Sequence, residues 1–285
     1  MNRLSIFYEH IAEAAEQSGL SLEETCRRVK DFGFDLVEMD AARLLREEDA
    51  LLPLLEKSGL GINCLYHFFS LGAKEGCAEN DCAEAEKIVS LAVRANCSRI
   101  LVVAGFLNDD ELDRTSEAYA AHRDRMAEGV RTVIKLAAEK GITVLMEDFD
   151  GVSAPFSTSD ELLWFMENVP GLRCGFDTGN FLYSEEDALK VLPKLLPYIG
   201  GIHCKDRSLK ENDGNVKLTV KGRKMYPVAV GDGDLDIGEM LRIILAAGYT
   251  GTVTAEHFDS KHQLRDMERS AAFMRSAVHN FYEKH

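Results

Sequence analysis

The chain has 285 residues and carries 48 acidic against 33 basic side chains, a formal net charge of −15. Such a charge repels the phosphates of nucleic acids, so we expect no nucleic acid partner. No apolar run reaches the roughly 18 residues of a membrane span, and the first residues lack the apolar region of a secretory signal. We therefore expect a cytoplasmic protein that does not bind membranes. The seven scattered cysteines form no Cys-x-x-Cys pair, which argues against a disulfide framework or a zinc ribbon.

Short apolar runs alternate with longer segments of helical periodicity along the whole chain. The runs that we predict to be strands are residues 4–7, 34–39, 61–66, 99–104, 142–146, 172–176, 199–204 and 252–255. The segments that we predict to be helices are residues 20–32, 47–57, 79–95, 116–140, 159–168, 185–196, 237–247 and 261–282. Glycine follows several of these helices, as it commonly does at helix C-termini.

The strict alternation of strand and helix predicts a parallel sheet of the α/β class. Eight such units fit a closed (β/α)8 barrel, typically of about 250 residues, better than an open sheet. An open doubly wound sheet usually carries a glycine-rich phosphate loop after its first strand, and this sequence has none there. We therefore predict one (β/α)8 barrel domain over residues 1–285, with a C-terminal helix.

An insert after the seventh predicted strand interrupts this alternation. Residues 207–229 lack helical periodicity, whereas residues 216–220 and 226–230 are patterned as the two strands of a β-hairpin. Basic side chains outnumber acidic ones between Lys205 and Lys224. Two interpretations stay open, since these charges could attract an anionic substrate to the barrel mouth or simply lie in solvent.

Polar residues follow four consecutive predicted strands at the points where these strands end. They are Glu147, Asp177, His203 and Glu256. The carboxyl ends of the strands meet at one face of a barrel, where the active sites of this fold lie. Three carboxylates and an imidazole suit one divalent metal ion, Mn²⁺, Mg²⁺, Co²⁺ or Zn²⁺. Such an ion can polarise a carbonyl group, and a neighbouring carboxylate can then remove a proton from the adjacent carbon.

Four motifs carry a resemblance to a known family. They are Phe-Asp-Thr-Gly-Asn at 176–180, Ile-His-Cys-Lys-Asp at 202–206, Gly-Asp-Gly-Asp-Leu-Asp-Ile at 231–237 and Ala-Glu-His at 255–257. With them the chain resembles the xylose isomerase-like TIM barrels, which include sugar phosphate isomerases/epimerases, ketose 3-epimerases and endonuclease IV. The resemblance implies the barrel fold and the metal ligands Glu147, Asp177, His203 and Glu256. It also implies that Glu147 and Glu256 flank the sugar carbon, one removing a proton and the other returning it.

The resemblance further implies substrate contacts from His67 and Glu38. Asn180 stands where the family often has histidine, and we expect its amide to bind a sugar hydroxyl. Lys205, Asp206 and Arg207 follow the seventh predicted strand, and we expect them to bind substrate as well. Endonuclease IV relatives need further histidines for three zinc ions, and the fourth strand here ends in Val-Ala-Gly-Phe at 103–106 without one. We therefore do not expect nuclease activity.

These patterns predict a divalent-metal-dependent isomerase or epimerase that acts on a small ketose or sugar phosphate through a cis-enediolate. One alternative is a metal-dependent lyase of the inosose dehydratase type, which would use the same base to expel a hydroxyl group. Another is a non-catalytic sugar-binding protein. The sequence decides neither the sugar, nor its phosphorylation, nor the metal, and a homo-oligomer stays open.

Overall fold

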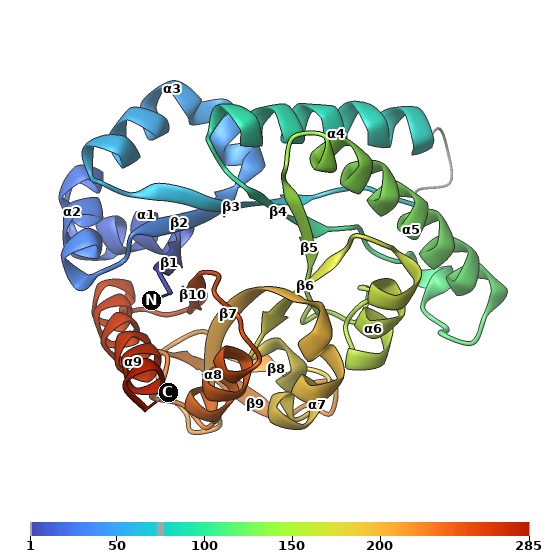
Figure 1. Cartoon of the computed structure of the whole chain (residues 1–285). Helices are drawn as coiled ribbons and strands as arrows, with labels where there is room; N and C mark the ends of the chain where they lie inside the picture. Colours follow the sequence, from blue (N-terminus) through green and yellow to red (C-terminus); the bar gives the residue numbers. More distant parts are fainter. Residues whose placement is uncertain (1, 73–76, 285) are drawn as a thin grey trace.

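The computed structural model describes residues 2–72 and 77–284 and shows a ring of parallel strands surrounded by helices (Figure 1). The strands of the ring are β1 (Leu4–Phe7), β2 (Leu36–Asp40), β3 (Gly61–Phe68), β4 (Arg99–Val103), β5 (Thr143–Met146), β6 (Arg173–Asp177), β7 (Ile199–Ser208) and β10 (Val253–Glu256). The helices are α1 (Tyr8–Ser18), α2 (Leu22–Phe32), α3 (Ala41–Lys57), α4 (Cys77–Arg94), α5 (Glu117–Ala138), α6 (Ser159–Asn168), α7 (Ala188–Leu195), α8 (Ile237–Ala246) and α9 (Gln263–Lys284).

The ring closes because β10 pairs in parallel with both β1 and β7. Its order is β1-β2-β3-β4-β5-β6-β7-β10, so each strand of the ring lies beside its neighbours in the chain. This confirms the predicted (β/α)8 barrel and its C-terminal helix. Helix α9 packs against α1 and α8, which brings the last part of the chain back to the first. In the described residues we find no helix with the length and apolarity of a membrane span.

The predicted β-hairpin after β7 is confirmed, with a shorter first strand and a second strand that begins at residue 224 rather than 226. Strand β8 (Lys217–Leu218) pairs antiparallel with β9 (Lys224–Val228), and β9 also pairs antiparallel with the last residues of β7. The prediction ended the seventh strand at residue 204, whereas β7 continues to Ser208. This extension exists because β9 supplies backbone partners beyond the end of the barrel.

One helix is absent from our sequence prediction. Helix α1 begins directly after β1, and its N-cap residue Phe7 makes no side-chain capping hydrogen bond. A polar N-cap residue is the usual sequence signal of a helix start. Helix α1 lacks such a residue, so the sequence did not reveal this helix. By contrast, the predicted helix at residues 20–32 corresponds to α2, which has a polar N-cap, since the side chain of Ser21 accepts a hydrogen bond from the backbone N–H of Glu24.

A small apolar cluster inside the barrel separates its two ends. Cys64, Leu101 and Leu145 are buried there, with Tyr66 packed on them. Gly201 makes room for Leu145, since a Cβ at this glycine would come within 2.8 Å of the leucine Cδ1. Side chains alternate between the two faces of a strand, so inward residues beyond this layer meet at the carboxyl ends of the strands.

Candidate metal centre and active site

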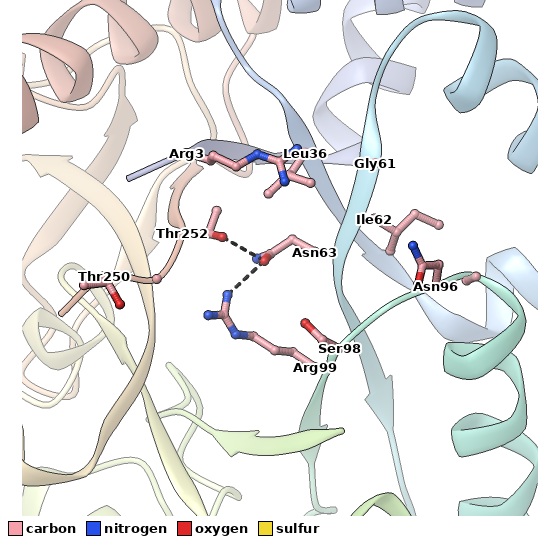
Figure 2. A pocket seen from close by; sticks show the side chains of 12 residues that line it. Arg3, Leu36, Gly61, Ile62, Asn63, Asn96, Ser98, Arg99, Thr250 and Thr252 are labelled. Carbon is pink, nitrogen blue, oxygen red and sulfur yellow. Dashed lines mark hydrogen bonds between the residues drawn. The ribbon is translucent and has the colours of Figure 1, made fainter. Parts of the chain in front are cut away.

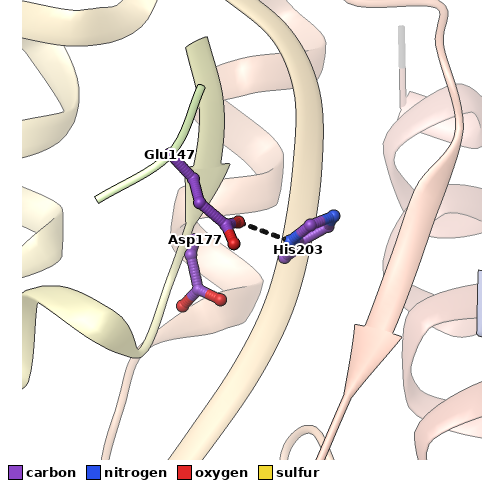
Figure 3. A group of neighbouring side chains, drawn as sticks. All are labelled: Glu147, Asp177 and His203. Carbon is purple, nitrogen blue, oxygen red and sulfur yellow. Dashed lines mark ion pairs between the residues drawn. The ribbon is translucent and has the colours of Figure 1, made fainter. Parts of the chain in front are cut away.

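Glu147, Asp177 and His203 meet at the carboxyl ends of three adjacent strands. Asp177 ends β6, His203 lies in β7, and Glu147 follows β5 directly. One ligand atom from each residue lies within 4.8 Å of the other two. Figure 3 shows the side chain of Glu147 facing His203 across their ion pair, with Asp177 beside Glu147. Three of the residues predicted as metal ligands therefore lie together in the structure and could hold a metal ion.

The donor atoms of this cluster fit a divalent ion. Within the described chain, Glu147 Oε2, Asp177 Oδ2 and His203 Nδ1 are buried, and their polar contacts there are ion pairs. Glu147 Oε2 and His203 Nδ1 lie 2.6 Å apart. The other oxygen of Asp177 accepts the backbone N–H groups of Gly179 at 2.7 Å and Asn180 at 2.8 Å, which fixes the carboxylate. Two hard oxygens and an imidazole nitrogen suit Mg²⁺, Mn²⁺, Co²⁺ or Zn²⁺.

Glu38 of β2 orients the imidazole of His203. Its Oε2 lies 3.0 Å from His203 Nε2, and its Oε1 accepts hydrogen bonds from Asn63 Nδ2 at 2.7 Å and Thr254 Oγ1 at 2.6 Å. With Nε2 engaged by Glu38, the other ring nitrogen, Nδ1, faces Glu147. Burial alone would lower the pKa of His203, but the carboxylates of Glu147 and Glu38 outweigh it and raise that pKa well above its usual range.

Lys205 places a positive charge beside Glu256 and Asp177. Its Nζ contacts Glu256 Oε1 and lies 3.5 Å from Asp177 Oδ2. Glu256 Oε2 lies 3.5 Å from His203 Nδ1, so Glu256 borders the three-residue cluster. Burial raises the pKa of Glu256 to about 8, although Lys205 acts in the opposite direction. Glu256 can therefore carry a proton near neutral pH, as an acid in proton transfer must.

The amide of Asn180 joins Lys205 to the loop after β5. Asn180 Oδ1 accepts a hydrogen bond from Lys205 Nζ at 2.7 Å, and its Nδ2 donates to the Asp148 carbonyl at 2.8 Å. Asn180 is buried and lines a cavity beside Glu147 and Glu256. Its first role in the structure is to position the lysine, and a contact with substrate stays a prediction.

A cavity of about 380 Å³ opens above these side chains. Its polar wall is formed by Glu147, Asp150, Asn180, Lys205, Arg207, Lys217, Glu256 and Asp259. Its apolar wall is formed by Phe7, Tyr66, Phe68, Leu101, Val103, Phe149 and Phe258. Arg207 and Lys217 both approach Asp150 Oδ2, at 3.5 and 2.5 Å, so this carboxylate offsets much of their charge. The cavity suits a small ligand with one polar and one apolar face.

The structure corrects the expectation for His67. Its Nε2 lies 2.9 Å from Glu84 Oε1 of α4, and its ring packs edge-on against Phe69. The adjacent residues Tyr66 and Phe68 line the cavity, and alternation along β3 turns His67 to the opposite face, toward the helices. His67 therefore joins the barrel to α4 and is not placed to bind substrate in the cavity.

Asp206 is also turned away from the cavity. Its Oδ2 accepts backbone N–H groups from Gly231 and Gly233, each at 2.9 Å, and its Oδ1 accepts that of Arg207 at 2.9 Å. These bonds tie the segment before α8 to β7. Glu38, likewise, lies beneath His203 and outside the cavity lining, so it contacts the candidate ligand rather than a substrate. Arg207, in contrast, reaches the cavity as expected.

Comparison with known proteins places the chain in a family. A family model described as xylose isomerase-like TIM barrel matches residues 26–277. The chain belongs to this family. The resemblance carried by the motifs between residues 176 and 257 is thereby confirmed.

Members with curated names cover only part of the chain. Inosose dehydratase 1 of Bacillus cereus is 31% identical over 140 residues, 47% of this chain and 46% of that protein. The chain thus matches about half the length of this curated relative. The activity in the name of this relative is stated of the relative and not of this chain.

Solved structures of this fold resemble the chain over nearly its whole length. A D-psicose 3-epimerase from Clostridium cellulolyticum H10, determined with D-tagatose, has a TM-score of 0.72 at 17% identity and covers 98% of this chain and 99% of its own. A xylose isomerase-like TIM barrel protein from Mycobacterium smegmatis, determined with magnesium, has a TM-score of 0.71 at 18% identity, covering 98% and 97%. At these identities the likeness establishes the fold.

Proposed function

We propose that this xylose isomerase-like protein is a metal-dependent isomerase or epimerase that moves a proton next to the carbonyl of a small ketose or sugar phosphate. The observation that carries the proposal is the position of two glutamates beside the same nitrogen of one imidazole, at the edge of one cavity. Glu147 Oε2 lies 2.6 Å and Glu256 Oε2 lies 3.5 Å from His203 Nδ1, and both residues line the cavity. Two carboxylates facing one small cavity can remove a proton on one side of a carbon and return it on the other.

Glu147, Asp177 and His203, with Glu256 beside them, would hold the ion. A divalent metal bound there supplies a Lewis acid for the substrate carbonyl and hydroxyl oxygens. The protein's own groups perform the proton transfers. One of Glu147 and Glu256 takes the proton from the carbon next to the carbonyl, a cis-enediolate forms, and the other glutamate returns a proton. Lys205 stabilises the negative charge of the enediolate, because its ammonium group is held in position by Asn180, Asp177 and Glu256.

A second candidate reaction is dehydration, which the similarity to inosose dehydratase favours. It begins with the same removal of a proton next to a carbonyl. The electron pair then expels the hydroxyl group on the following carbon, and that group leaves as water after taking a proton from Glu256. The burial that raises the pKa of Glu256 to about 8 suits it to this donation.

One experiment separates these reactions. The protein, loaded with Mn²⁺, is incubated in heavy water with a set of ketoses, ketose phosphates and inososes, and NMR spectroscopy follows deuterium uptake and products. An epimer or isomer that carries deuterium supports the first proposal. An unsaturated product formed by loss of water supports dehydration instead. Binding of a sugar with neither exchange nor product would contradict both reactions and favour a sugar-binding protein.

Two variants link the result to the residues. Glu256→Gln retains Glu147, Asp177 and His203, so it should still load with metal at saturating Mn²⁺, and it should lose proton exchange by about 10²- to 10⁴-fold, the usual contribution of one acid or base. Asp177→Asn should lose metal and exchange together. Full exchange by Glu256→Gln would contradict the assignment of two glutamates.

A further inference from the structure

A second cavity lies at the opposite end of the barrel from Glu147. It has a volume of about 560 Å³ and opens among the amino ends of β1, β2, β3, β4 and β10 (Figure 2). The apolar layer of Cys64, Leu101 and Leu145 separates it from the candidate metal centre. Barrel active sites lie at the carboxyl ends of the strands, so the proposed function makes no use of this base cavity.

The base cavity lacks acidic groups in an acidic protein. Its polar lining consists of guanidinium, amide and hydroxyl side chains, from Arg3, Asn63, Asn96, Ser98, Arg99, Thr250 and Thr252. No carboxylate belongs to the lining contributed by the described residues, although the chain holds 48 acidic side chains against 33 basic ones. The local charge is therefore positive, which favours an anionic ligand.

A hydrogen bond to Asn63 positions the guanidinium of Arg99. Its Nη1 donates to Asn63 Oδ1 at 2.8 Å, and Thr252 Oγ1 donates to the same oxygen at 2.9 Å (Figure 2). Asn63 is buried and donates in turn to Glu38 at 2.7 Å. A guanidinium has five N–H donors, and the described residues engage one of them. Its other donors are available to a ligand, and its position is fixed before any ligand arrives.

Gly251 provides the space for this guanidinium. A Cβ at Gly251 would come within 2.5 Å of the Tyr249 hydroxyl oxygen and 2.8 Å of Arg99 Nη2, so a larger residue would displace both side chains. A neighbouring cavity of about 600 Å³ shares Arg99, Thr250 and Gly251 with the base cavity and adds Arg173. Arg173 donates to the Ile199 carbonyl at 2.9 Å, and neither Arg99 nor Arg173 lies within ion-pair distance of a carboxylate in the described chain.

We propose that the base cavity binds the phosphate group of a small molecule between Arg99 and the hydroxyl groups of Ser98 and Thr250. The planar fork of arginine matches the oxygens of a phosphate, and hydroxyl groups complete such sites as further donors. The site is distinct from the substrate cavity and requires no metal. Its ligand is a free phosphate ion or a phosphate monoester small enough for the cavity.

Isothermal titration of the full chain with inorganic phosphate at low ionic strength tests the proposal. We expect saturable binding of one phosphate per chain. Thr250→Glu adds a carboxylate at an exposed position of the lining, away from the Arg99–Asn63 bond, and should weaken binding by about tenfold or more. Thr250→Gln, of similar size but uncharged, removes only the hydroxyl group and should weaken binding less than Thr250→Glu. Arg99→Gln should also lose binding.

A phosphate could instead enter the substrate cavity, where Arg207 lies, so Arg207→Gln is titrated in parallel. Unchanged affinity in this variant supports the base cavity. Binding that is lost in Arg207→Gln but kept in Thr250→Glu would overturn the proposal, as would no binding of phosphate by the unaltered protein. Glycerol phosphate distinguishes the two sources, because tighter binding than that of free phosphate identifies a monoester as the ligand and weaker binding identifies the free ion.

Discussion

Glu38 Oε2 lies 3.0 Å from His203 Nε2, although 165 positions of sequence separate the two residues. The contact crosses the inside of the barrel and joins a buried carboxylate to the imidazole of the candidate metal centre. Burial alone would raise the pKa of Glu38, but its ion pair with His203 outweighs this effect and lowers that pKa. Glu38 is therefore ionised in the folded protein and can fix both the orientation and the tautomer of the histidine.

Replacing Glu38 with glutamine should weaken metal binding. The neutral amide no longer strengthens the imidazole as a donor, and partners of this kind usually contribute about 10- to 100-fold to metal affinity. Titration with Mn²⁺ measures the change. Glu84→Gln is the matched control, because Glu84 pairs with His67 at a similar distance of 2.9 Å but outside the barrel. Equal affinities in the two variants would contradict the role assigned to Glu38.

Gly179 provides the space in which Lys205 reaches the carboxylates. A Cβ at this position would come within 2.7 Å of both the Lys205 carbonyl oxygen and its Cγ. Gly179→Ala should therefore destabilise the protein by about 1–3 kcal/mol through overpacking and displace the lysine. Gly238→Ala is the control, since there a Cβ meets its nearest atom at 3.8 Å within α8. Urea unfolding compares the two, and similar stability of both variants would contradict the prediction.

The sequence could predict those site residues that stand where an apolar run and its strand end together. Glu147 and Asp177 stand at the ends of β5 and β6, where the predicted and observed ends lie within a residue of each other. In the sequence, each of these two residues is the carboxylate that follows an apolar run, and this pattern identified both. The position of His203 among them follows from the parallel register, in which it lies opposite Asp177. Three of the four expected ligands thus gather in one cluster, and Glu256 borders it.

Where a strand runs further than its apolar run, the sequence does not show which of its polar residues face the cavity. Strand β3 extends to Phe68 and β7 to Ser208, both beyond the predicted ends. Side chains there still alternate, so Lys205 and Arg207 face the cavity, whereas His67 and Asp206 face away from it. A polar residue after an apolar run does not reveal which face it will occupy. Strand pairing supplies that information, here through β9 in the case of β7.

Asp206 should act on stability rather than on substrate binding. Its carboxylate accepts backbone N–H groups of Arg207, Gly231 and Gly233, so Asp206→Ala leaves several donors without a partner. One such buried donor costs about 1–3 kcal/mol, and we expect a loss in this range or above it in urea unfolding. The exposed neighbour Asp232 pairs with Arg269, and Asp232→Ala should cost no more than about 1 kcal/mol. A stable Asp206→Ala variant with weakened substrate binding would restore our first expectation.

Glu111, in the loop between β4 and α5, should make the protein sensitive to acid. It is buried, and its Oε2 accepts the backbone N–H of Asn108 at 3.0 Å and lies 2.8 Å from His122 Nδ1. Burial opposes ionisation of Glu111, but these partners outweigh it and lower its pKa to about 2. A carboxyl whose pKa is lower in the folded state stabilises the fold above its unfolded pKa of about 4.3. That stabilisation is lost as the pH falls from about 4.3 to about 2.

Glu111→Gln isolates this contribution. At pH 7 the variant should be less stable than the unaltered protein by about 1–3 kcal/mol, because it loses hydrogen bonds to a charged group. The difference in the free energy of unfolding should shrink as the pH is lowered toward 2, since the native carboxyl then becomes neutral as well. Glu139→Gln, which removes an exposed carboxylate just after α5, should show no such convergence. A difference that stays constant from pH 7 to pH 3 would contradict the assignment, because the ionised form of Glu111 would then not be the stabilising one.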